Sequence, residues 1–180
     1  MFLEKIDDTN DLKKLNRKEL KELANEVRAA LINKISKAGG HSGPNLGMVE
    51  MTVALHYVFD SPNDKFVFDV SHQSYPHKIL TGRKEAFLDE EHFHDVTGYT
   101  NPLESEHDMF TIGHTSTSVS LALGLAIGRD LNKKAENIIA IIGDGSLSGG
   151  EALEAIDYAG EYNKNLIIIV NDNDQSIAEN

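Results

Sequence analysis

Two short polar segments, Gly143-Asp144-Gly145 and Asn171-Asp172-Asn173, carry the residue types in this sequence that best suit chemistry. Asp144 offers a carboxylate and Asn173 an amide oxygen. Mg²⁺ prefers oxygen ligands and shares its shell with substrate phosphates. The two glycines allow close approach of the backbone, and Gly145 and Ser146 lead toward a helix N-terminus, which favours anions. The pattern therefore predicts a cation that holds a phosphate ester, although each segment alone also fits a helix cap or a turn.

Each segment follows an apolar run that is predicted to be a strand. Residues 138–142 and 166–170 are continuous and rich in β-branched side chains, as strands buried on both faces should be. Residues 150–162 predict a helix between them, with Leu153, Ile156 and Tyr158 on one broad face. Because a right-handed crossover brings the carboxyl ends of two parallel strands to one edge of the sheet, we expect Asp144 and Asn173 to meet there.

The remaining pattern indicates an α/β fold, a doubly wound, mostly parallel sheet with helices on both faces. Apolar residues recur at helical spacing over 17–36, and Asn16 suits the N-cap of that helix. Further expected elements are a helix over 46–59, a strand over 66–70, a helix over 75–81 with Pro76 in its first turn, and a helix over 116–129. Residues 82–109 are polar and are expected to be irregular.

Three more motifs narrow the interpretation. They are Gly39–Gly47 (GGHSGPNLG), Asp69–Lys78 (DVSHQSYPHK) and Gly113–Ser118 (GHTSTS). In this order, and followed by GDG and NDN, they resemble the 1-deoxy-D-xylulose-5-phosphate synthases, a transketolase-like family of thiamine-diphosphate enzymes. The resemblance runs from about Leu15 to Asn180 and implies the thiamine-diphosphate-binding fold.

The resemblance also implies the cofactors, thiamine diphosphate and Mg²⁺, and the residues that hold them. Asp144, Asn173 and the main-chain oxygen of Gln175 would bind the metal. The expected cofactor contacts are His72, Gly113, His114, Thr115, Gly145, Ser146 and Asn173. His41 would face the reacting carbon and assist proton transfer, which suits imidazole because its pKa lies near physiological pH.

The activity implied is a carboligation in isoprenoid biosynthesis. Pyruvate would lose CO₂, and its remaining carbons would join glyceraldehyde 3-phosphate. The resemblance further implies a homodimer in the cytoplasm, with pyruvate and sugar phosphates as partners. Two alternatives stay open: a transketolase-like transfer of two carbons between sugar phosphates, and a non-catalytic module for cofactor binding or assembly.

Several histidines have plainer interpretations as well. His41 also fits a solvent-exposed turn, and Gly113–Thr115 also fits a simple helix cap. His77 and Lys78 would either reach the site or only cap and pair. His92, His94 and His107 allow a transition-metal site, but no second motif closes it, and the segment is typical of a surface loop.

The chain departs from the family pattern at three places. The family usually has a basic, glycine-paired stretch where this chain has Glu91–Val96, and an arginine where this chain has Pro102. Ser71 replaces the usual glycine before His72. Loss of two cations near a site for anionic substrates predicts an altered substrate preference, whereas the cofactor motifs are intact.

Composition sets outer limits on function. The 180 residues are 40% hydrophobic and 26% charged, with a net charge of −12, which argues against nucleic acid and anionic membranes as partners. There is no cysteine and no apolar run of about 20 residues, the length of a membrane span. Because the resembled enzymes are several times longer, we expect residues 1–180 to be an incomplete N-terminal diphosphate domain of a longer multidomain enzyme.

Overall fold

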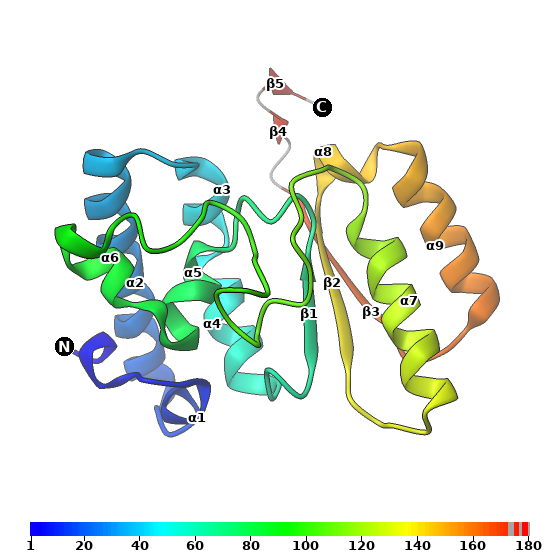
Figure 1. The fold of residues 1–180 in the computed structure, drawn as a ribbon, viewed down its shortest axis with the longest axis horizontal. Helices are drawn as coiled ribbons and strands as arrows, with labels where there is room; N and C mark the ends of the chain where they lie inside the picture. The colour runs from blue at the N-terminus through cyan, green and yellow to red at the C-terminus, as the bar shows by residue number, and fades with distance from the viewer. Residues whose placement is uncertain (173–174, 177, 180) are drawn as a thin grey trace. The chain divides into compact units, whose positions relative to one another are not determined.

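The computed structural model describes residues 1–172, 175–176 and 178–179 (Figure 1). The chain divides into two compact units, each assembled from two stretches of sequence. The first unit comprises Met1–Ser61 and His72–Tyr99, and the second comprises Pro62–Ser71 and Thr100–Asn180. No helix in the described part of the chain is long and apolar enough to cross a membrane.

The first unit is helical. Its long helix α2 (Arg17–Ala38) begins at a capping box, in which Asn16 accepts hydrogen bonds from the amides of Lys18 and Glu19 while the Glu19 side chain accepts one from the Asn16 amide. The other elements are η1 (Leu3–Lys5), α1 (Thr9–Leu12), α3 (Ser42–Gly47), α4 (Val49–Val58), α5 (Tyr75–Lys78), η2 (Ile79–Arg83), α6 (Glu85–Leu88) and η3 (Glu90–His92). Segment η2 contains a kink, because the backbone is not helical at Thr81 and Gly82.

The core of the first unit forms along the apolar face of α2. Leu23, Val27 and Leu31 are fully buried there and pack with apolar residues of α4, η2 and α6. Lys34 on the same helix is also buried, and its Nζ donates to the carbonyls of Ala86 and Phe93. This ammonium group therefore ties α2 to the segment around α6, as buried charges require such partners.

The second unit contains a parallel sheet with the order β1-β2-β3 (Figure 1). The strands are β1 (Lys65–Phe68), β2 (Ile138–Gly143) and β3 (Ile167–Asn171), and the helices are α7 (Ser118–Leu131), α8 (Asp144–Leu147) and α9 (Gly150–Tyr162). A short antiparallel pair, β4 (Gln175–Ser176) and β5 (Ala178–Glu179), follows β3.

Both faces of β2 are removed from solvent. Ile138, Ala140 and Ile142 belong to one core cluster with apolar residues of α7 and α9, while Ile139 and Ile141 on the opposite face are equally buried. The helix residues in that cluster are mostly small, which permits close packing: Val119, Ala122, Ala126, Ala152 and Ala155. The predicted α/β class with a parallel sheet is thus confirmed.

Several predicted elements need correction. The expected helix over 46–59 is two helices, α3 and α4, separated at Met48. The strand expected over 66–70 ends at Phe68, because Val70 has a φ of 55°, which a strand excludes. Residues 82–109 are not wholly irregular, since α6 and η3 form there.

Helix α9 has the predicted bounds, and its fully buried positions are alanines. Ala152 and Ala155 are buried, whereas Leu153 and Tyr158 are 55% and 56% exposed. The alanines pack in the core cluster, and Ile156 packs against the same cluster while partly buried. Of the three residues predicted to share one face, Ile156 is therefore partly buried, whereas Leu153 and Tyr158 are exposed.

Candidate cofactor-binding and catalytic site

The carboxyl ends of β2 and β3 lie side by side. Gly143, the last residue of β2, pairs in register with Asn171, the last residue of β3. Asp144 follows directly as the first residue of α8 and is half-buried, and Asp172 follows β3 and is exposed. The expected approach of the two polar segments is therefore confirmed as far as Asn171. Asn173 lies outside the described residues, and the metal-binding role of Gln175, whose backbone belongs to β4, stays a prediction.

The turn before α7 is held by a carboxylate from the end of β1. Asp69 is buried, and its Oδ1 accepts the amide of Ser116 at 2.8 Å while its Oδ2 accepts the amide of Ser118 at 2.9 Å. Asp69 thus caps the N-terminus of α7 from far away in sequence, where a negative charge is favourable. Gly113, His114 and Thr115, the predicted cofactor contacts, precede this cap and are exposed.

Ser116 joins this turn to the one that carries Asp144. Its hydroxyl donates to the carbonyl of Ser146 at 2.8 Å. The side chain occupies space that Gly149 leaves open, since a Cβ at residue 149 would lie only 2.0 Å from Ser116 Oγ. Ser116 holds a left-handed φ of 69° in this position. The Gly113–Thr115 turn and the Asp144–Ser146 turn are consequently fixed to each other.

Ser71 fixes the other side of the same turn. It is fully buried with a left-handed φ of 66°, a conformation that costs a non-glycine residue about 1–2 kcal/mol. Its hydroxyl donates to the carbonyl of Ile112 at 3.0 Å and accepts the amide of Thr100 at 2.9 Å. These two bonds offset the backbone strain and anchor the chain just before Gly113.

His41 lies in the first unit, between Gly40 and the first turn of α3, and it is exposed. The ring of His72 meets it edge-on, with centroids 5.2 Å apart and planes at 88°. Tyr99 also meets the His41 ring edge-on, at a centroid distance of 6.0 Å. The two predicted functional histidines of the first unit are therefore neighbours. Because His72 and Asp144 belong to different units, the expectation that they share one sheet edge stays a prediction.

His77 and Lys78 are completely buried, and both have structural partners. His77 Nδ1 lies 2.9 Å from His56 Nε2, and the two rings stack with an interplanar angle of 20°. Lys78 Nζ donates to the carbonyl of Thr97 at 3.0 Å. Of the two interpretations that the sequence left open, these contacts favour pairing over a direct role in the site.

The histidines of the loop before α7 form no metal centre in the described part of the chain, which contains no cluster of three potential His, Asp or Glu ligands. His92 Nδ1 lies 2.7 Å from Asp95 Oδ2. This hydrogen bond, reinforced by the charge of Asp95, raises the pKa of His92 above its ordinary value. The spacing of these residues thus produces an exposed ion pair.

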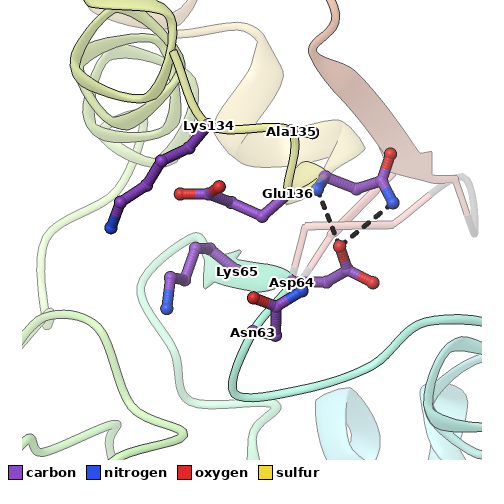
Figure 2. Close-up of a pocket in the computed structure, with 7 residues that line it drawn as sticks. Asn63, Asp64, Lys65, Lys134, Ala135 and Glu136 are labelled. Carbon is purple, nitrogen blue, oxygen red and sulfur yellow. Dashed lines mark hydrogen bonds between the residues drawn. The ribbon is translucent and has the colours of Figure 1, made fainter. Parts of the chain in front are cut away.

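A separate cavity of about 590 Å³ lies at the amino ends of β1 and β2 (Figure 2). Lys65, Lys134 and Glu136 line it together with Asp64 and Asn137, and Asp64 accepts two hydrogen bonds from Asn137. Ligands of parallel sheets bind at the carboxyl ends of the strands. Since none of the predicted site residues lines this open, polar cavity, we place the candidate site at the opposite ends of the strands, with Asp144.

Comparison with known proteins decides the family. A family model described as 1-deoxy-D-xylulose-5-phosphate synthase matches residues 3–180. The chain belongs to the 1-deoxy-D-xylulose-5-phosphate synthase family. The synthase of Brevibacillus brevis is 51% identical over the whole chain, and that of Shouchella clausii is 53% identical over the whole chain. The chain spans 29% of the length of each of these relatives.

Solved structures show the same fold. A transketolase from Campylobacter jejuni matches 91% of this chain and 29% of its own, with a TM-score of 0.75 and 24% identity. A transketolase from Leishmania mexicana matches 88% of this chain and 28% of its own, with a TM-score of 0.73 and 23% identity. The synthase-family chain therefore has the fold of the transketolases, as its sequence predicted.

Sequence reasoning found the residues that face outward at the site and missed those that hold them. Asp69, Ser116 and Asn45 were not singled out, although each is buried and hydrogen-bonded to a predicted site segment. One signal was present for Asp69, a carboxylate directly after a short buried strand. Asn45 and Ser116 lie within the GGHSGPNLG and GHTSTS motifs, but the sequence does not reveal their roles, because His72 and Ser146, to whose carbonyls they donate, are 27 and 30 residues away in the chain.

Proposed function

We propose that this member of the synthase family is the diphosphate- and metal-binding domain of a longer thiamine-diphosphate-dependent enzyme. The observation that carries the proposal is the hydrogen bond from Ser116 to the carbonyl of Ser146. It holds the exposed turn Gly113–Thr115 beside Asp144, so that anion-binding and cation-binding groups of one unit can act on the same ligand.

The groups at this edge fit a magnesium diphosphate. Asp144 supplies a half-buried carboxylate at the end of a buried strand, and oxygen ligands of this kind suit Mg²⁺. Gly113, His114 and Thr115 are exposed, and their backbone amides and the Thr115 hydroxyl are of the kind that donates to phosphate oxygens. Asn173, the carbonyl of Gln175 and the turn at Gly145 and Ser146 would complete the set.

When bound, thiamine diphosphate would supply the electron sink that lets a 2-oxo acid lose CO₂. The residues of this chain would bind and orient it. His41, exposed at the start of α3, would hold or release a proton at an imidazole nitrogen while the substrate reacts, a role for which the imidazole pKa is suited. His72, in edge contact with His41, would bind the diphosphate or a sugar substrate.

The complete enzyme would join the two carbons left from pyruvate to glyceraldehyde 3-phosphate, a reaction that serves isoprenoid biosynthesis. We further propose that it works as a cytoplasmic homodimer with small-molecule substrates. Support for the reaction comes from family membership at 51–53% identity. The proposal extends to the whole enzyme, since the matched relatives are more than three times as long as this chain.

Calorimetry with thiamine diphosphate and Mg²⁺ tests the proposal. The complete enzyme should bind the cofactor only when the metal is present, and Asp144→Ala should abolish this Mg²⁺-dependent binding because the remaining ligand oxygens are neutral. Asp157→Ala removes an exposed carboxylate from α9 in the same unit and should leave binding unchanged. Equal binding by Asp144→Ala and the wild type would contradict the metal assignment. Absence of binding by the wild type would favour a non-catalytic module.

A second candidate function, transketolase-like transfer from a ketose donor, is favoured by one observation. Two cations that the family usually has are replaced by Glu91 and Pro102, and both replacements are exposed. Neither can bind a carboxylate or phosphate in the bidentate manner of arginine. Kinetics with pyruvate and with xylulose 5-phosphate, measured side by side, would discriminate. A kcat/KM for pyruvate of about 10⁴ M⁻¹s⁻¹ or more would exclude this alternative.

A further inference from the structure

A single buried side chain contacts the backbone of both His41 and His72, the two predicted functional histidines of the first unit. The Nδ2 of Asn45, in α3, donates to the carbonyl of His41 at 2.6 Å and to the carbonyl of His72 at 2.8 Å. Its Oδ1 accepts the amide of Tyr75 at 2.8 Å. Asn45 has no solvent exposure. One amide group thus bridges the start of α3 and the start of α5.

The partners determine the orientation of this amide. Two of them are carbonyl oxygens, which only accept hydrogen bonds, and the third is a backbone N–H, which only donates. The nitrogen of Asn45 must therefore point toward His41 and His72, and the oxygen toward Tyr75. Aspartate has the same shape but offers no donor unless protonated, and it would place oxygen against two carbonyl oxygens.

The backbone before His41 needs this restraint. Gly39 and Gly40 have φ values of 77° and 130°, and glycine readily moves among several such conformations. The side chain of His41 does not cap α3, so no bond from its own side chain fixes it to the helix. Tyr75, whose amide binds Asn45, also packs its hydroxyl against Gly40: a Cβ built there would lie 2.9 Å from it. Asn45 therefore lies at the centre of the contacts that fix His41.

The position of each imidazole follows from the position of its backbone. The rings of His41 and His72 touch edge-on at 5.2 Å, and Asn45 holds the carbonyls of these same two residues. We infer that Asn45 is a positioning residue, through which one buried amide sets both His41 for proton transfer and His72 for cofactor binding. This inference rests on the proposed function of the two histidines.

The test compares Asn45→Ala and Asn45→Asp with His41→Ala and His72→Ala in the complete enzyme. His41→Ala should lower turnover at saturating cofactor, and His72→Ala should weaken cofactor binding. Both Asn45 variants should change both quantities by about tenfold or more, because two donated hydrogen bonds are lost in a buried place. Adding Asn45→Ala to His41→Ala should lower turnover no further, whereas general destabilisation would lower it again.

A structural readout without substrate accompanies the kinetics. The amide of Tyr75 should exchange its hydrogen for deuterium about tenfold faster in Asn45→Ala, since it loses its acceptor. Thr52→Val in α4 is the matched control, because Thr52 is equally buried and its hydroxyl has no hydrogen-bond partner in the described part of the chain. This control should change neither turnover, cofactor affinity nor Tyr75 exchange.

The outcomes separate the two proposals. If the histidine variants act as expected but both Asn45 variants keep wild-type turnover and affinity, the inference about Asn45 is overturned and the proposed function stands. If neither histidine variant has an effect, the roles of the histidines are wrong and the inference falls with them. Should Asn45→Ala fail to fold, Asn45→Asp, which leaves no cavity, still decides between these results.

Discussion

Asp69→Ala removes the carboxylate that caps α7 and should destabilise the second unit strongly. The amides of Ser116 and Ser118 would lose their acceptors at 2.8 and 2.9 Å. Both serines are buried, with exposures of 7% and 0%, so water cannot readily replace the carboxylate. The change therefore leaves two unsatisfied donors at the first turn of the helix.

The expected magnitude follows from these two bonds. A hydrogen bond to a charged group contributes about 1.5–3 kcal/mol, so the pair contributes about 3–6 kcal/mol. Burial of the carboxylate, which is 1% exposed, costs free energy that the substitution recovers. We therefore expect a loss near the lower end, about 3 kcal/mol, from a domain stability of about 5–15 kcal/mol.

Urea unfolding of the variant measures this loss, and Asn16→Ala provides the comparison. Asn16 caps α2 at the surface, where removal of a cap costs about 1 kcal/mol. Hydrogen exchange should also become faster at Ser116 and Ser118 in Asp69→Ala and remain unchanged at Lys18. A free energy of unfolding for Asp69→Ala equal to that of Asn16→Ala, or unchanged exchange at the two serines, would refute the reasoning.

Three further predictions concern other parts of the molecule. His41→Ala should lower the turnover of the complete enzyme by roughly 10²–10⁴-fold, the usual contribution of a general acid or base, with less effect on cofactor affinity; steady-state kinetics with unchanged turnover and weaker cofactor binding would make His41 a binding residue. Gly149→Ala should destabilise the second unit by about 1–3 kcal/mol by overpacking, because the new Cβ would displace Ser116 Oγ; denaturant unfolding should show that Ser116→Gly in the same chain removes this penalty, and no relief would disprove the clash. Asp95→Asn should lower the pKa of His92, because the hydrogen bond with Asp95 raises that pKa in the folded protein. The pair stabilises the fold fully below the pKa of His92 in the unfolded chain, about 6.5, and this stabilisation is lost as pH rises through the pKa of His92 in the folded protein. An NMR titration of His92 with the same midpoint in both proteins would contradict the pairing.

The parts of the fold that the sequence predicts well are those that local pattern controls. The β-branched runs gave β2 and β3 to within one residue at each end, and the helix between them has the predicted bounds of α9. The meeting of Gly143 and Asn171 follows from the parallel pairing of the two strands that this crossover joins. The position of Asp144 at the edge of the sheet can therefore be predicted without any knowledge of side-chain contacts.

The failures come from contacts between distant residues. Val70 is β-branched and was assigned to a strand, but the chain turns there with a φ of 55° because Asp69 and Ser71 are bound to segments beyond residue 99. The break at Met48, between α3 and α4, follows Gly47, but a single glycine does not distinguish the end of one helix from a position inside a longer one. At the site, the motifs contain both kinds of residue, but the sequence pattern does not distinguish a buried positioning residue such as Asn45 from the polar residues that face solvent.

The alternation of the two units along the chain has a consequence for synthesis on the ribosome. All residues of the first unit have been made once Tyr99 is added, but β1 has by then no strand to pair with, since its partner β2 ends only at Gly143. Because the ribosome adds about 5–20 residues per second, the apolar strand Phe66-Val67-Phe68 stays unpaired for several seconds. During that interval the unpaired strand can bind other nascent chains or chaperones. Slower translation between Tyr99 and Gly143 should therefore lower the yield of folded protein.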